Sequence, residues 1–256
     1  MKIIVSIIIT NFNYSKFIKK CLESCINQNF NQNKYEIIFI DDNSSDDSIK
    51  EVNKFKKRFK NLKILKNSKN LGVAQSANKG IKNAKGKYII RVDSDDYINN
   101  QLLTVLASFL EYNKDFFSVS CDYYLVNLEG KRISKVSYEE NPISCGIMYK
   151  KNKLLNLGCY NSKFRHREEE ELRLRALKKG YKNFYTNLPL YYYLKHKKNK
   201  TNSNEFKYSF KEKIDKLIYE DKFKDFKKNE KTILKNVITI IPARLNSKRL
   251  KNKNLK

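Results

Sequence analysis

YIIRVDSDDY, residues 88–97, is the stretch from which the fold of this chain can be worked out. Its apolar start predicts a short buried strand, which runs directly into three carboxylates at Asp93, Asp95 and Asp96. Burying bare carboxylates is unfavourable, so this cluster favours a bound Mg²⁺ or Mn²⁺, the ions that oxygen ligands select. Because ligands of open α/β sheets bind at the carboxyl ends of strands, we expect a metal that holds a diphosphate. The alternative is an acidic turn that caps a helix beginning near Asn99, and an isolated motif this short fits both.

The chain before this stretch alternates between predicted strands and predicted helices. This order is typical of a wound α/β sheet with right-handed crossovers. Ser44 and Asp47 are expected to cap the second helix, which would end near Phe59, and Gly86 is expected to end the third. The predicted strands cover residues 2–10, 35–40 and 62–65, and the first and third helices cover 15–27 and 73–84.

Polar side chains stand at the ends of three of these strands. Thr10 and Asn11 follow the first, Asp41 and Asp42 follow the second, and the acidic cluster from Asp93 follows the fourth. Because parallel strands end at one edge of a sheet, these groups are expected to line a site for a nucleotide diphosphate. A carboxylate of the second strand end can accept hydrogen bonds from a base or a ribose.

Composition limits the classes of protein to which the chain can belong. The 256 residues suit one large domain, or one domain with a fragment, and 40% hydrophobic residues suffice for a core. No apolar run reaches about 18 residues, so no transmembrane helix is expected, and the strand-like start lacks a signal-peptide cleavage site. The five scattered cysteines, without zinc spacing, predict buried free thiols and a cytoplasmic location.

The net charge of +27 makes nucleic acid a partner to consider. The excess is nearly all Lys, in company with abundant Asn, Ile and Tyr, and no segment resembles a module that reads DNA or RNA. We therefore expect no nucleic-acid partner. Residues 195–256 hold 20 basic and 7 acidic residues, a net charge of +13, and such a tail can also lie on an anionic membrane surface.

Four motifs together resemble family-2 glycosyltransferases of the GT-A fold, over about the first 195 residues. They are IIITNFNY at 7–14, IDDNSSDDS at 40–48, NLGVAQSANKGIKNAKGKYI at 70–89 and DSDD at 93–96. The resemblance implies a GT-A (Rossmann-like) mixed α/β sheet flanked by helices. It also implies a nucleotide-diphosphate sugar as donor, Mn²⁺ or Mg²⁺ as cofactor, and inversion at the anomeric carbon.

The same resemblance assigns roles to residues on the donor side. The nucleotide pocket would be lined by Thr10, Asn11 and Tyr14. Asp41 would meet the base, with Asp42 nearby, and Asp93 would contact the ribose or the base. Asp95, with Asp96 beside it, would hold the metal against the diphosphate.

A second acidic segment, REEEELRLRALKKGY at 167–181, predicts a helix with a stop at Gly180. By the resemblance, Glu168 and Glu169 fall where the family carries Glu-Asp, and the second position is the family's general base. Glu169 is therefore the candidate base. Because Glu is longer than Asp, Glu168 or Glu170 can also serve. The alternative is surface pairing along the helix, of Glu169 with Arg173 and of Glu171 with Arg175.

Beyond the first domain, residues 1–195, we expect two smaller segments. Residues 196–235 are a Lys-rich helical extension, which can pack on the domain, link domains or contact the membrane peripherally. Residues 236–256 resemble the opening strand and loop of the cytidylyltransferases that make CMP-nonulosonic (sialic) acids, truncated before a core can form. His166 is a minor candidate for contact with a phosphate or an acceptor, and His196 receives no role.

The predicted function is that of an inverting, metal-dependent glycosyltransferase in surface polysaccharide biosynthesis. Its acceptor would be a glycan, a lipid-linked molecule or a protein, and it would act in the cytoplasm or at the inner face of the membrane. Two alternatives stay open, a nucleotidyltransferase that activates a sugar and a non-catalytic basic protein that binds polyanions.

Overall fold

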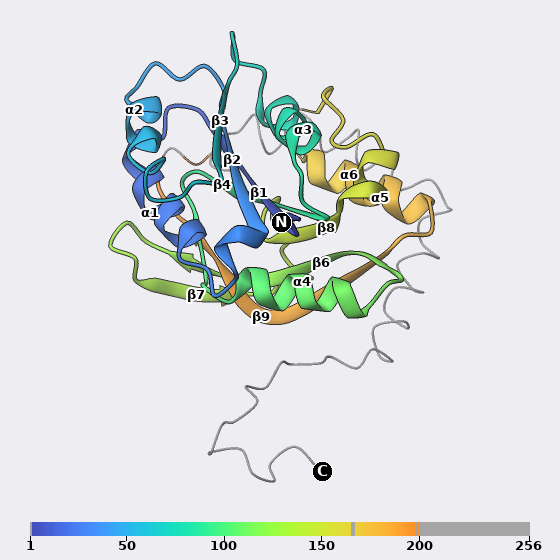
Figure 1. Ribbon diagram of the computed structural model, residues 1–256. Coiled ribbons are helices and arrows are strands. Elements are labelled where there is room, and N and C mark those ends of the chain that lie inside the picture. Colours follow the sequence, from blue (N-terminus) through green and yellow to red (C-terminus); the bar gives the residue numbers. More distant parts are fainter. Residues whose placement is uncertain (1, 165–166, 198, 200–256) are drawn as a thin grey trace.

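The computed structural model describes residues 2–164, 167–197 and 199. Over these residues nine strands form one sheet, with helices on both faces (Figure 1). None of the helices in these ranges is long and apolar enough to cross a membrane. The predicted fragment at 236–256, and the extension beyond residue 199, lie outside the described residues.

The first half of the sheet is parallel and confirms the predicted wound α/β order. β1 lies between β2 and β4, and β3 follows β2 at the edge. Residues of β1 and β2 are buried at every position, which explains their continuous apolar runs. The elements are β1 (Val5–Asn11), α1 (Ser15–Ile26), η1 (Gln32–Lys34), β2 (Tyr35–Asp41), α2 (Ser48–Asn53), β3 (Leu62–Lys66), α3 (Val73–Asn83) and β4 (Tyr88–Asp93).

The second half makes the sheet mixed, as expected. β8 joins it antiparallel to β4, β6 runs antiparallel to β8, and β9 runs parallel to β6. β7 pairs with the far end of β6 as a hairpin. The elements are β5 (Tyr97–Ile98), α4 (Leu102–Tyr112), β6 (Phe116–Val126), β7 (Arg132–Val136), β8 (Ile147–Lys150), α5 (Lys151–Asn156), α6 (Glu168–Lys178) and β9 (Lys182–Leu194).

The core consists of two apolar layers, one on each face of the sheet. Ile7 and Ile9 of β1 contribute to the layer under α1, α2 and α4, whereas Ile8 between them contributes to the layer under α3, α5 and α6. All five cysteines are buried free thiols, which confirms that prediction.

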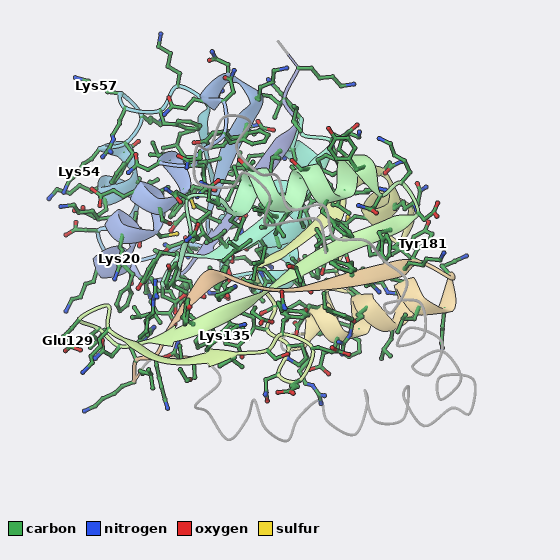
Figure 2. The ribbon with its side chains drawn as sticks, turned by 90° about the horizontal axis from the view of Figure 1, so that it is seen from below. Lys20, Lys54, Lys57, Glu129, Lys135 and Tyr181 are labelled. Carbon is green, nitrogen blue, oxygen red and sulfur yellow. The ribbon has the colours of Figure 1, made fainter. Side chains whose placement is uncertain are left out.

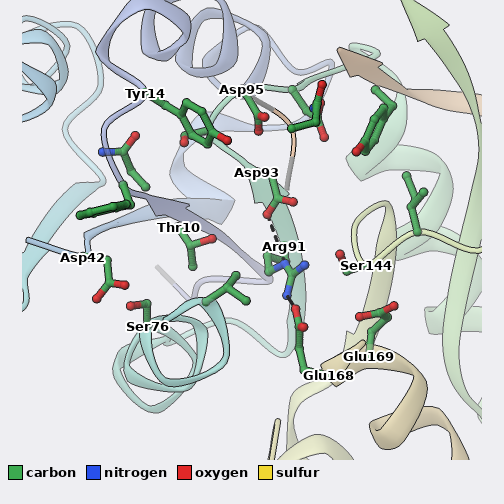
Figure 3. Close-up of a pocket in the computed structure, with 18 of the residues that line it drawn as sticks. Thr10, Tyr14, Asp42, Ser76, Arg91, Asp93, Asp95, Ser144, Glu168 and Glu169 are labelled. Atoms are coloured by element: carbon green, nitrogen blue, oxygen red, sulfur yellow. Dashed lines mark hydrogen bonds and ion pairs between the residues drawn. The ribbon is translucent and has the colours of Figure 1, made fainter. Parts of the chain in front are cut away.

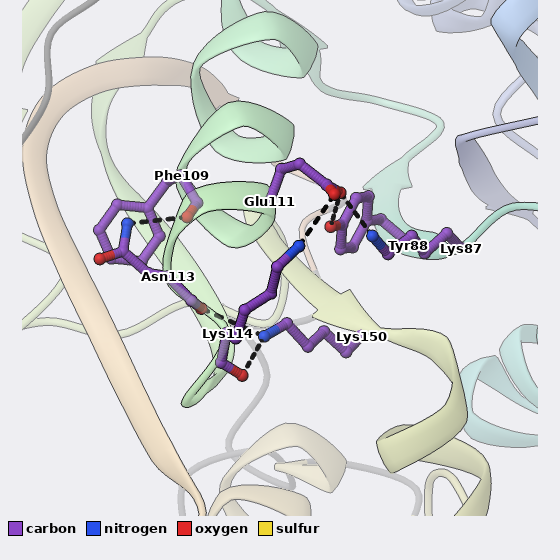
Figure 4. A network of polar contacts seen from close by, with 7 residues as sticks. All are labelled: Lys87, Tyr88, Phe109, Glu111, Asn113, Lys114 and Lys150. Carbon is purple, nitrogen blue, oxygen red and sulfur yellow. Dashed lines mark hydrogen bonds and ion pairs between the residues drawn. The ribbon is translucent and has the colours of Figure 1, made fainter.

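Polar contacts fix α4 to the sheet at the end remote from the carboxyl ends of the parallel strands (Figure 4). Glu111 accepts hydrogen bonds from Lys87 Nζ at 2.5 Å and from the Tyr88 hydroxyl at 2.6 Å, and the contact with Lys87 lowers the pKa of Glu111 to about 2. Lys150 Nζ donates to two backbone carbonyls just beyond α4. All of these contacts lie away from the carboxyl ends of the parallel strands, which is the edge where the site is expected.

The predicted capping of α2 was partly wrong. Asp47 is its N-cap residue but makes no side-chain capping hydrogen bond, and the Ser48 amide donates instead to Asp46 at 3.0 Å. The helix ends at Asn53 rather than near Phe59. β9 closes the sheet as one long strand, with shifts in register against β6.

Gly86 is required for close packing against β1 and does not act as a helix stop. A Cβ atom there would lie 2.5 Å from the Ser6 amide nitrogen and 2.7 Å from the Val5 carbonyl carbon. We expect Gly86→Ala to lower the free energy of unfolding by about 3 kcal/mol, since backbone atoms must move apart. Urea unfolding would measure this, with Lys85→Ala as the control. A Gly86→Ala variant as stable as the wild type would contradict the packing argument.

Candidate active site

A pocket of about 270 Å³ opens where the carboxyl ends of β1 and β4 face the start of α6 (Figure 3). Nine of the ten predicted site residues line it, and Asp41 is the exception. They are Thr10, Asn11, Tyr14, Asp42, Asp93, Asp95, Asp96, Glu168 and Glu169. The register of the sheet accounts for this, because Thr10 pairs with Asp93 and Asn11 pairs with Asp41.

The two carboxylates at the end of β2 accept hydrogen bonds from other groups of the protein. Asp41 is fully buried, and its two oxygens accept from Asn11 Nδ2 at 3.2 Å and from the Ser44 amide at 3.1 Å. Asp42 accepts from Asn67 Nδ2 and from the backbone amides of residues 71 and 72, each at 2.8 Å. Asp42 therefore holds the loop before α3 against the pocket, and Asp41 holds the turn beneath it.

The three carboxylates after β4 lie in different surroundings. Asp93 faces the pocket, and its Oδ1 is buried with no hydrogen bond among the described residues. Asp95 Oδ2 lies 2.9 Å from His196 Nε2. Asp96 is buried and accepts from the Tyr191 hydroxyl and the Leu194 amide, both at 2.8 Å. Burial, and then Asp95 and Asp93, raise the pKa of Asp96 well above its ordinary value.

His196 is a site residue that the sequence analysis missed. Its ring stacks on Phe17 at 4.7 Å, meets Tyr14 edge-on at 5.6 Å and contacts Asp95. Asn199 Oδ1 accepts from the His196 amide and fixes the loop after β9. His196 stands 101 residues from Asp95, and no sequence motif marked it.

The acidic end of β4 suits a divalent cation in part. Within 2–164, 167–197 and 199, no three His, Cys, Asp or Glu side chains stand together as a complete metal site. Asp93 Oδ1, which makes no hydrogen bond among the described residues, Asp95 and His196 nevertheless offer the oxygen and nitrogen ligands that Mn²⁺ accepts. The remaining ligands would have to come from a bound substrate or water, as is usual for Mg²⁺.

Arg91 links the two sides of the pocket from within the sheet (Figure 3). Its side chain is 4% exposed, and its Nη1 donates to Glu168 Oε1 at 2.7 Å. Its Nε lies 3.4 Å from Asp93 Oδ1. A buried arginine thus ties the strand that carries the acidic cluster to the first residue of α6.

Glu169 differs from its three acidic neighbours on α6. Glu168 pairs with Arg91, Glu170 with Arg167, and Glu171 with Arg175. Among the described residues Glu169 makes no ion pair or hydrogen bond through its carboxylate. Of the two pairings in the alternative interpretation, that of Glu171 with Arg175 is present in the described part of the chain and that of Glu169 with Arg173 is not.

The surroundings of Glu169 favour its protonated form. The side chain lies in the pocket wall near Ser144 and is 9% exposed (Figure 3). Burial, and then the neighbouring Glu168, raise the pKa of Glu169 to about 8. A carboxylate in such surroundings can exchange a proton near neutral pH, as a general base must.

Known proteins resemble this chain both in sequence and in fold. The model of the family described as "Glycosyl transferase family 2" matches residues 6–173. The Escherichia coli protein WfaP, "UDP-Glc:alpha-D-GlcNAc-diphosphoundecaprenol beta-1,3-glucosyltransferase", is 34% identical over 211 residues, which are 80% of this chain and 82% of WfaP. The poly(ribitol-phosphate) beta-glucosyltransferase of Bacillus spizizenii is 35% identical over 140 residues, 54% of this chain. The chain spans only 22% of that relative's length.

Solved structures share the GT-A fold. Staphylococcus aureus TarS 1–349 in complex with UDP-GlcNAc superposes with a TM-score of 0.69, at 23% identity over 86% of this chain and 67% of TarS 1–349. The mannosyltransferase PcManGT from Pyrobaculum calidifontis, in complex with GDP-Man and Mn²⁺, gives 0.65 at 16% identity, over 78% of this chain and 59% of that one. At these identities the likeness extends to the fold alone.

Proposed function

This chain belongs to glycosyl transferase family 2, and we propose that it transfers a sugar from a nucleotide-diphosphate sugar to a hydroxyl group of an acceptor. One observation carries the proposal: the acidic end of β4 faces a buried, unpaired carboxylate, Glu169, across a single pocket. Such a pair of walls suits a reaction in which a diphosphate leaves from one side and an acceptor loses a proton on the other.

On the donor side, we assign the nucleotide to the wall formed by Thr10, Asn11 and Tyr14, with Asp93 toward the ribose. Asp95 is the carboxylate placed to hold Mn²⁺ or Mg²⁺, with His196 beside it. A bound divalent cation would neutralise the charge of the departing diphosphate. Asp96 keeps both oxygens on β9, which favours a supporting role over that of a ligand.

On the acceptor side, Glu169 removes the proton from the attacking hydroxyl. Arg91 holds Glu168, the preceding residue of α6, and so keeps Glu169 on the pocket wall. Because the base and the acidic cluster lie on opposite walls, the acceptor oxygen would approach the anomeric carbon from the face opposite the diphosphate. This arrangement supports inversion at that carbon.

The acceptor class follows from the relatives. WfaP acts, by its name, on a sugar linked to diphosphoundecaprenol, which supports a lipid-linked acceptor and a role in surface polysaccharide synthesis. Glycan and protein acceptors remain predictions. The nucleotidyltransferase alternative depended on residues 236–256, which lie outside the described residues, and no observation in the described part favours it.

The direct test is a transfer assay on the full chain. UDP-glucose and UDP-GlcNAc would be supplied with Mn²⁺ and an undecaprenyl-diphosphate-linked GlcNAc, and release of nucleoside diphosphate would be followed together with the glycolipid product. We expect acceptor-dependent release with at least one donor. Release that ignores the acceptor, with no glycolipid product from either donor, would contradict the proposal.

A further inference from the structure

Three tyrosines stack in a row on the face of the sheet that is turned away from the pocket. Tyr192 of β9 lies between Tyr97 of β5, at 4.6 Å between ring centroids, and Tyr124 of β6, at 5.7 Å. Along β9 the neighbour Tyr191 donates to Asp96 and the neighbour Tyr193 lines the pocket, so the alternation of a strand places Tyr192 on the other face. All three rings of the row are partly exposed.

Two cations lie against this row, Lys20 on Tyr97 and Arg132 beside both Tyr124 and Tyr192. Lys20 Nζ of α1 lies 4.0 Å from the centre of the Tyr97 ring. The Arg132 guanidinium of β7 lies 4.3 Å from Tyr124 and 5.8 Å from Tyr192. The row therefore presents solvent with partly exposed aromatic rings next to positive charge.

The hairpin between β6 and β7 adds exposed aliphatic side chains to the row. Asn127 closes its turn, accepting from the amides of Gly130 and Lys131. Leu128 and Ile133, 62% and 56% exposed, are two of the five large hydrophobic residues that are exposed in the described part of the chain. A Cβ atom on Gly130 would lie 2.9 Å from Lys20 Nζ, so the turn adjoins the row.

We propose that this surface, formed by Lys20, the three tyrosines and residues 127–135, binds an anionic lipid bilayer; it is called the hairpin surface below. Residues 127–135 carry Lys131 and Arg132 against one acidic residue, Glu129, which complements anionic headgroups, whereas Lys135 is paired with Asp122 at 3.1 Å. Figure 2 shows Lys20 and Glu129 on the same side of the molecule.

The exposed aliphatic side chains of the hairpin favour a bilayer over a soluble polyanion as the partner. A polyanion needs only the cations, whereas the interface of a bilayer also takes up leucine, isoleucine and tyrosine. Binding at the hairpin surface does not depend on sugar transfer. If transfer occurs, however, β9, which contributes Tyr192 to the hairpin surface and Tyr193 to the pocket, would hold the pocket close to a lipid-borne acceptor.

Vesicle co-sedimentation of the full chain tests this inference. We expect binding to phosphatidylglycerol–phosphatidylcholine vesicles and little binding to phosphatidylcholine alone. Leu128→Ser with Ile133→Ser should lower the partition constant about tenfold, and Arg132→Gln should lower it about fivefold. The matched control, Tyr112→Ser with Leu155→Ser, removes two exposed hydrophobic residues of α4 and α5 and should change nothing.

The outcomes separate the hairpin surface from other sites. Unchanged vesicle binding by the Leu128→Ser, Ile133→Ser variant would overturn the proposal, because another segment would then carry the binding. Equal loss of vesicle and polyphosphate binding in Arg132→Gln, with no effect of the aliphatic change, would also overturn it in favour of a polyanion site. Circular dichroism melting of each variant verifies that it is folded, and the vesicle result does not depend on whether transfer is observed.

Discussion

Replacing Glu169 by Gln is expected to lower the rate of sugar transfer about a thousandfold, the size of effect that loss of a general base produces. The amide keeps the shape of the side chain but cannot take a proton from the acceptor. Because Glu169 lies on the wall opposite the acidic cluster, the affinity for the donor should stay within about twofold, as in other changes that remove an interaction made only in the transition state.

The pH dependence of the wild type gives a second readout of the same residue. Burial raises the pKa of Glu169 to about 8, and the base acts in its deprotonated form. Below that pKa the rate should therefore rise about tenfold for each pH unit, and above it the rate should level off. In Glu169→Gln this rise should disappear.

The control for Glu169→Gln lies on the same helix. Glu171 does not line the pocket and already has a partner in Arg175, so Glu171→Gln should retain the wild-type rate and pH profile. The measurement is the turnover number with saturating donor between about pH 6 and pH 9, around the pKa that burial gives to Glu169. A Glu169→Gln variant with more than half of the wild-type rate would rule out Glu169 as the base.

Arg91→Met is expected to lower the free energy of unfolding by about 3–5 kcal/mol, the effect of removing one partner of a buried ion pair. Glu168 would remain, 4% exposed in its side chain, without the one cation that pairs with it in the described part of the chain and with Glu169 next to it. Adding Glu168→Gln should restore part of the stability, because the uncompensated charge is then gone. Urea unfolding of the two single variants and of the double variant measures this coupling.

Arg91→Met should also move the pH profile of transfer. The guanidinium lowers the pKa of Glu169 against the larger effect of burial, so its loss should shift the midpoint above that of the wild type. Arg91→Lys, which keeps the charge but not the paired geometry, should lie between the two. Stability within about 1 kcal/mol of the wild type, together with an unchanged midpoint, would contradict the role given to Arg91.

Periodicity predicted the parallel half of the sheet, because strands buried on both faces are continuous apolar runs. The same argument predicted that Thr10, Asn11 and Asp93 would meet, since parallel strands end together. Periodicity could not distinguish carboxylates that are available to a ligand from those that hydrogen-bond the protein. Asp41 and Asp42 accept hydrogen bonds from backbone amides of loops, and the shape of a loop has no periodic pattern in the sequence.

Contacts across long sequence separations explain the residues that were missed. Arg91 and Glu168 are 77 positions apart, and Asp95 and His196 are 101 apart. The sequence did contain one signal for Arg91, a charged residue inside the buried run YIIRVD, because an arginine is almost never fully buried unless it is paired. No comparable signal marked His196.

The most direct test of the account is calorimetric titration of the full chain with UDP and GDP, with and without Mn²⁺. We expect that at least one of them binds, that Mn²⁺ tightens the binding, and that Asp95→Ala removes the Mn²⁺-dependent part. Asp115→Asn, an exposed carboxylate outside the pocket, should bind as the wild type does. Absence of binding by both nucleotides, or equal Mn²⁺-dependent binding by Asp95→Ala, would contradict a nucleotide-diphosphate site at the end of β4.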